Sequence, residues 1–159
     1  MKRGVTKEEI IHATQELIAR NGIRAVRVDE IAQTLGISKR TLYEMFTDKN
    51  DLVSACLEAM SHQQRERIVA CRKRRGGNPL QKVLRLTNEY IDNLYTVDHR
   101  FLSDISRKII FAEHYDEHRE FWRRELNDYL ETCRQEQLLL PEIDAPAFAE
   151  QLMSTILDL

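Results

Sequence analysis

The stretch Arg27–Lys49, RVDEIAQTLGISKRTLYEMFTDK, decides how this chain folds. Its first part carries four apolar residues at the i, i+3, i+4 and i+7 spacing of a one-faced helix: Val28, Ile31, Ala32 and Leu35. Gly36 comes next, at a place where a helix can end in the left-handed conformation. The spacing therefore predicts a short helix that stops at Gly36.

A second short helix follows the glycine. The hydroxyl of Ser38 can accept a hydrogen bond from the exposed amides of a helix that begins after it. Leu42, Met45 and Phe46 form the inner face of that helix. Its outward residues offer cationic, hydroxyl and carboxylate groups to phosphates and base edges, and they are Lys39, Arg40, Thr41, Tyr43 and Glu44. Two such helices around a tight turn are typical of a DNA-binding helix-turn-helix.

The composition predicts an all-α protein. The chain has 159 residues, 42% of them hydrophobic, which is enough for one or two small domains with buried cores. Only 5 Gly and 3 Pro are present, so there is little turn-forming material for a sheet protein.

The net charge of -2 hides an asymmetry along the chain. Residues 1–75 hold 15 Lys or Arg against 10 Asp or Glu, a balance of +5, and residues 76–159 hold 9 against 16, a balance of -7. This split suits a basic module that approaches a polyanion, although two ordinary solvated surfaces would give it as well.

The cysteines and the apolar runs predict a cytoplasmic protein. Cys56, Cys71 and Cys133 are odd in number, widely spaced and without a CxxC pair, which favours buried, reduced thiols over a redox or metal role. The N-terminus lacks the apolar segment of a signal peptide, and no apolar run approaches the length of a membrane span.

Capping signals mark further helices along the chain. Thr6 and Glu9 fit a capping box, and Gly22 ends the helix that they begin. Asp48 caps a helix of roughly 26 residues, on the order of 40 Å long. Apolar stripes predict four more helices, over residues 80–98, 101–109 and 122–133 and after the cap at Asp144.

The segment from about Lys7 to Leu57 resembles the N-terminal DNA-binding domain of TetR-type transcriptional regulators. The likeness lies in several separated elements with matching spacing: Asn21-Gly22, Val28-x-x-Ile31-Ala32, Gly36-Ile37-Ser38-Lys39, Thr41-Leu42-Tyr43, Phe46 and Lys49-x-x-Leu52. The resemblance implies a helix-turn-helix domain over residues 1–50. A long helix then joins it to a helical ligand-binding and dimerisation domain over residues 51–159.

The resemblance also implies a function, namely a homodimeric repressor that binds a near-palindromic operator in double-stranded DNA and is released by a small-molecule effector. It places Ser38 through Glu44 in the major groove and makes Tyr43 and Lys49 phosphate contacts. Arg40 is the best candidate for base readout, because a guanidinium can bond two acceptors on a guanine edge. No enzyme activity, metal or cofactor is implied.

The chain departs from the family pattern in two places. Arg27 stands where the family has Thr or Ser before the first helix of the motif; it cannot cap in the same way, and it can contact a phosphate instead. The apolar stripe that begins after Asp144 runs to Leu159 without a cap or a glycine. We therefore expect the C-terminal domain to be truncated.

Four aromatic residues of the C-terminal part are candidates for lining an effector pocket: Tyr90, Phe101, Phe111 and Trp122. For each of them separately, packing in a hydrophobic core is the alternative.

A rival signal is His114-Tyr115-Asp116-Glu117-His118, which matches the H-x-x-E-H spacing of one group of zinc peptidases. The spacing leaves a metal-dependent hydrolase as an alternative function, although no third ligand is recognisable and the segment is predicted to be a solvated junction between two helices. A helical interaction module without DNA binding is another alternative.

Overall fold

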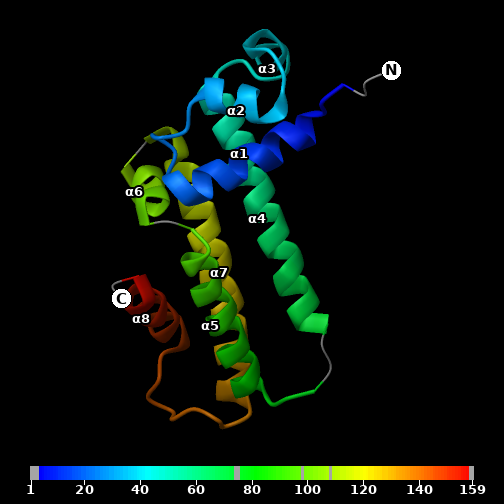
Figure 1. Ribbon diagram of the computed structural model, residues 1–159. Helices are drawn as coiled ribbons and strands as arrows, with labels where there is room; N and C mark the ends of the chain where they lie inside the picture. The colour runs from blue at the N-terminus through cyan, green and yellow to red at the C-terminus, as the bar shows by residue number, and fades with distance from the viewer. Residues whose placement is uncertain (1–3, 74–75, 98, 108, 158–159) are drawn as a thin grey trace. The chain divides into compact units, whose positions relative to one another are not determined.

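The computed structural model describes residues 4–73, 76–97, 99–107 and 109–157. These residues form eight α-helices and no strand (Figure 1). The helices are α1 (Lys7–Asn21), α2 (Val28–Leu35), α3 (Lys39–Met45), α4 (Lys49–Lys73), α5 (Pro79–Tyr95), α6 (His99–Arg107), α7 (Ile109–Gln135) and α8 (Ala145–Leu157). None of the described helices combines the length and the apolar character that crossing a membrane requires.

The beginning of α1 is fixed by the predicted capping box. The Thr6 amide donates to Glu9 Oε2 at 2.8 Å, and the Glu9 amide donates to Thr6 Oγ1 at 3.2 Å. Gly22 ends the helix with a φ of 78°, a value that favours glycine.

The turn between α2 and α3 also forms as predicted. Gly36 is left-handed, with φ 63° and ψ 31°, and its amide and that of Ile37 donate to carbonyl groups in the last turn of α2. Ser38 then caps α3, because its hydroxyl accepts a hydrogen bond from the Thr41 amide at 3.1 Å.

The long helix α4 has 25 residues and begins after Asp48. Asp48 accepts a hydrogen bond from the Asp51 amide at 2.9 Å, and Asp51 accepts one from the Thr47 amide at 2.8 Å. At the start of α5, the Asn78 amide donates to Gln81 Oε1 at 3.2 Å and the Gln81 amide donates to Asn78 Oδ1 at 2.9 Å.

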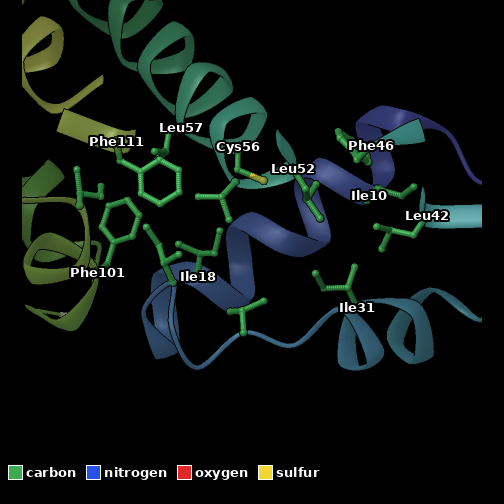
Figure 2. Close-up of a cluster of buried hydrophobic side chains, with 14 residues drawn as sticks. Ile10, Ile18, Ile31, Leu42, Phe46, Leu52, Cys56, Leu57, Phe101 and Phe111 are labelled. Atoms are coloured by element: carbon green, nitrogen blue, oxygen red, sulfur yellow. The ribbon is translucent and has the colours of Figure 1, made fainter. Parts of the chain in front are cut away.

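The first of two compact units comprises Met1–Arg65 and Thr96–Tyr115. Its core contains Ile10 and Ile18 of α1, Ile31 of α2 and Leu42 of α3. Figure 2 shows Phe101 and Phe111 beside Leu57 in this core. The unit is therefore discontinuous in sequence, because α6 and the first turns of α7 complete the core of the helix-turn-helix.

The second unit comprises Glu66–Tyr95 and Asp116–Leu159. Its core is formed by one face of α7 together with residues of α4, α5 and α8: Ile68, Val83, Leu86, Tyr90, Trp122, Leu126, Leu130, Cys133, Ala145, Ala149 and Met153. The functional boundary at residue 50 stays a prediction, since the units divide the chain by packing.

One element differs from the prediction. The segment His114–His118 lies inside α7, which already begins at Ile109, and it is not a junction between helices. The cysteines are free thiols as expected, with Cys56 and Cys133 buried and Cys71 half-buried.

Candidate nucleic-acid interface

The outward face of α3 carries the predicted set of polar side chains. Ser38, Lys39, Arg40, Tyr43 and Glu44 are exposed, and Thr41 is half-buried. The opposite face is covered, because Leu42 and the helix-ending Phe46 belong to the core of the first unit and Met45 packs against it. Packing of the apolar face thus fixes which groups of α3 point to solvent.

Both basic residues of α3 are held by carboxylates of the helix-turn-helix itself. Lys39 Nζ lies 2.6 Å from Asp29 Oδ1, so this ion pair links α3 to α2. Arg40 Nε donates to Glu44 Oε1 at 3.1 Å within α3, and the Arg40 side chain is 89% exposed. Exposed pairs of this kind contribute about 0–1 kcal/mol, so a phosphate or a base edge can replace them at little cost.

Hydroxyl groups occupy the two ends of the α3 surface. Ser38 Oγ and Thr41 Oγ1 lie 3.0 Å apart and share a hydrogen bond. Tyr43 is 48% exposed, which leaves its ring and phenol accessible to a partner. These groups suit contacts to phosphate oxygens.

Arg27 stands at the N-cap of α2, where the sequence departs from the family pattern. Its side chain is exposed and makes no capping hydrogen bond with any described residue. The predicted loss of the cap is confirmed. The guanidinium stays at the N-terminal end of α2, where it can meet a phosphate.

Lys49 begins α4 and is tied to the loop between α1 and α2. Its ammonium donates to the backbone carbonyl of Val26. An ammonium carries three N–H donors, and a phosphate oxygen is as suitable an acceptor for them as a carbonyl oxygen. Lys49 therefore also holds the loop that leads into α2.

A pair that the sequence did not reveal fixes the same loop from α6. Asp104 is a buried carboxylate of α6, and it accepts a hydrogen bond from the Arg24 amide at 2.9 Å. Arg24 Nε lies 3.1 Å from the other oxygen of the same carboxylate. The two residues are 80 positions apart, so no local pattern announces their contact.

The four aromatic candidates for an effector pocket do not form one group. Tyr90 and Trp122 pack together in the second unit, with ring centroids 5.1 Å apart. Phe101 and Phe111 belong to the core of the first unit. All four side chains are buried, which is the alternative that the sequence left open.

Polar partners of the aromatic pair were missed by sequence reasoning. The indole of Trp122 donates to His118 Nε2 at 3.1 Å, and the Asn93 amide lies 3.4 Å from the same nitrogen. Trp122 follows His118 by four residues, so the helical spacing is the signal that could have revealed this pair.

The H-x-x-E-H segment does not assemble a metal site among the residues that the structure describes. His114 and His118 lie one turn apart on α7, as the spacing requires, but the Nε2 atom of His118 accepts the hydrogen bond from Trp122. A metal ligand would need a lone pair that this bond uses. The contact instead explains His118 as a packing partner of Trp122.

A surface hollow of about 360 Å³ in the second unit has a charged lining. Arg72 of α4 contributes to it and pairs with Glu125 Oε2 at 2.7 Å and with Asp128 Oδ2 at 3.1 Å, both on α7. Burial raises the pKa of Glu125 above its usual value, and the adjacent Arg72 guanidinium only partly offsets this effect. The hollow thus differs in character from the apolar pair Tyr90 and Trp122.

Comparisons with known proteins agree with the motif. Residues 10–56 match the family model described as "Bacterial regulatory proteins, tetR family". The uncharacterized HTH-type transcriptional regulator MT0489 of Mycobacterium tuberculosis is 45% identical over 51 residues, which make up 32% of this chain and 21% of the relative. The match thus spans about a fifth of the relative's length.

Solved structures extend the likeness to most of the chain. A transcriptional regulator from Saccharomonospora viridis in complex with choline has a TM-score of 0.82 at 22% identity, over 94% of this chain and 80% of that chain. FadR from Bacillus subtilis in complex with stearoyl-CoA has a TM-score of 0.73 at 20% identity, over 95% and 83%. The predicted all-α fold, with an N-terminal helix-turn-helix and a C-terminal helical part, is confirmed.

Proposed function

We propose that this chain is a sequence-specific DNA-binding transcriptional regulator, because its N-terminal helix-turn-helix matches the model of the TetR family of bacterial regulatory proteins over residues 10–56. The observation that carries the proposal is the outward polar face of α3, held between the left-handed Gly36 and the Ser38 cap, within the segment that matches the family. The proposal assigns the chain no catalytic role.

The residues of α3 would divide the work of recognition. Arg40 reads a guanine edge, since the ion pair with Glu44 engages its Nε and its two terminal amino groups can face two acceptors. Lys39 and Thr41 contact either bases or phosphates. Tyr43, Lys49 and Arg27 contact phosphates and so set the register without reading sequence.

The regulator would act as a homodimer and as a ligand-responsive repressor in the cytoplasm. Two copies place their recognition helices in major grooves about one helical turn apart, roughly 34 to 36 Å, or a multiple of it, on a near-palindromic operator. A small-molecule effector would bind in the second unit near Tyr90 and Trp122 and favour dimers whose spacing no longer fits. Support comes from solved relatives of the same fold in complex with choline and with stearoyl-CoA.

The test is a selection of binding sites from random double-stranded DNA, followed by affinity measurements on the enriched sequence. We expect a near-palindromic site for the wild-type chain. Arg40→Ala should relax the preference at one position of each half-site, by about 1 to 3 kcal/mol of lost discrimination. Arg134→Ala is the matched control, because it removes an exposed guanidinium that pairs with a carboxylate of its own helix, Glu131, in the second unit.

The outcomes separate the proposed function from its alternatives. If the wild-type chain enriches no sequence and binds no DNA, a helical interaction module becomes the better description. If the wild-type chain enriches a site and Arg40→Ala binds it with unchanged preference, the base-reading role of Arg40 is wrong.

A further inference from the structure

A single carboxylate of α6 holds the loop between α1 and α2, residues 22–27. The two oxygens of Asp104 are used separately, Oδ2 by the Arg24 amide at 2.9 Å and Oδ1 by Arg24 Nε at 3.1 Å. The Asp104 side chain is only 10% exposed, whereas that of Arg24 is 62% exposed. One nearly buried group therefore fixes both the backbone and the side chain of a loop residue.

Gly22 makes this close approach of the loop and α6 possible. A Cβ atom at this position would lie 3.0 Å from Arg100 Cβ and 3.1 Å from Asp104 Oδ2. The backbone there also has a φ of 78°, which L side chains rarely adopt. Both space and conformation thus restrict position 22 to glycine, on the side of α1 that faces α6.

The same loop leads directly into the helix-turn-helix, and it is anchored from outside at two points. Asp104 holds Arg24, and the Lys49 ammonium holds the carbonyl of Val26. The first backbone amides of α2 receive no hydrogen bond from a capping side chain, because Arg27 provides none within the described chain. The loop that leads into α2 is therefore fixed in part from α6, which adds to the packing of Ile31 and Leu42 in the core.

We infer that Asp104 is a positioning residue for DNA binding, an inference that rests on the proposed function. Hydrogen bonds to base edges need donor and acceptor within about 2.7 to 3.2 Å, so a small displacement of α2 and α3 breaks them. Contacts to phosphates through long, flexible cations tolerate such a displacement better. Loss of the two contacts between Asp104 and Arg24 should thus weaken specific DNA binding more than non-specific DNA binding.

The experiment compares Asp104→Asn with the wild-type chain on the operator selected by the wild type and on an unrelated duplex. The asparagine amide is almost isosteric with the carboxylate, but one of the two acceptors that face Arg24 becomes a donor. We expect operator affinity to fall about tenfold and non-specific affinity to change less than about threefold. Asp92→Asn is the control, because it makes the same charge change at an exposed residue of α5.

The direction of the effect separates positioning from charge. Removal of a carboxylate makes the protein more positive and by itself strengthens DNA binding, as Asp92→Asn should show weakly. A double-mutant cycle with Arg24→Met then tests whether the two residues act together. We expect Asp104→Asn to have little further effect on operator affinity once Arg24 is changed.

Thermal unfolding gives the folded fraction of each variant, so that a loss of stability can be separated from a loss of affinity. If operator and non-specific affinities fall equally once they are corrected for the folded fraction, or if neither falls, the inference is wrong. Should Asp104→Asn fold poorly, Arg24→Met, which changes the exposed member of the pair, decides the question. The readout is the same ratio of operator affinity to non-specific affinity. A wild-type chain that selects no operator would instead remove the proposed function itself.

Discussion

The thiol of Cys56 is surrounded by the core of the first unit. It is fully buried, and its Sγ donates to the Ile11 carbonyl at 3.6 Å. Burial raises the pKa of Cys56 from 9.0 to about 12. The charged form is disfavoured in this position because the thiolate would lose its hydration.

This shift predicts a loss of stability at alkaline pH. The folded pKa lies above the unfolded value, so the stabilising contribution is complete below pH 9 and is lost as the pH rises toward 12. In urea unfolding between pH 9 and 11, the wild-type chain should lose up to about 1.4 kcal/mol per pH unit through this group. Cys56→Ala should show a shallower slope even if its stability at pH 7 is lower. Parallel slopes for the two chains would contradict the prediction.

At the scale of the single residue, the sequence predicts those side chains whose partners are close in the chain. Ser38 and Gly36 act on backbone groups within five residues, so their types alone indicate a cap and a helix end. Asp104 acts on Arg24 across 80 residues, and nothing in its neighbourhood distinguishes it from a solvated acid. The positioning role therefore needed the fold.

Among the described residues, helix α2 begins without a side-chain cap, unlike α1 and α3. Arg27→Ser would supply the missing acceptor for the first amides of α2, and we expect a gain of about 1 kcal/mol in the free energy of unfolding. Arg27→Ala is the matched control, because it removes the same guanidinium without offering a cap. Chemical denaturation of both variants measures the difference. Equal stabilities would show that the bonds from Lys49 and Asp104 already hold this end.

Helix ends were predictable where a capping residue or a glycine marks them, and one was missed where neither occurs. Residues 80–140 contain neither Gly nor Pro, so no breaker separates the predicted helices there. The sequence therefore predicts a solvated junction in the N-terminal part of α7, although this part is continuous helix from Ile109. Apolar periodicity likewise identified Phe101 and Trp122 as inward-facing, but it does not say which core each one joins.

The charge asymmetry of the whole chain would make the proposed DNA binding sensitive to salt. Residues 1–75, which include the helix-turn-helix, carry a balance of +5, so binding should release counterions from the duplex. Under the proposed function, a Lys49→Ala variant would lose one phosphate contact in each protomer. If a dimer binds, the slope of log affinity against log salt should fall by about 2, and by about 1 for a monomer.

Fluorescence anisotropy on the selected operator, measured from about 50 to about 200 mM salt, gives this slope for each variant. Arg134→Ala, far along the sequence in the second unit, should leave the slope unaltered. An unchanged slope for Lys49→Ala would mean that its ammonium makes no phosphate contact and has a structural role, which includes its bond to the Val26 carbonyl.

The discontinuity of the first unit limits how its proposed DNA specificity could be transferred to another regulator. A hybrid regulator that takes only residues 1–65 from this chain would leave behind Phe101, Ile105 and Phe111, which fill the core from residues 96–115. It would also deprive the Arg24 amide of its acceptor and present Gly22 to a foreign helix with its own side chains. A working graft must carry α6 and the start of α7 together with the helix-turn-helix, because these two separate segments of sequence form one folded unit.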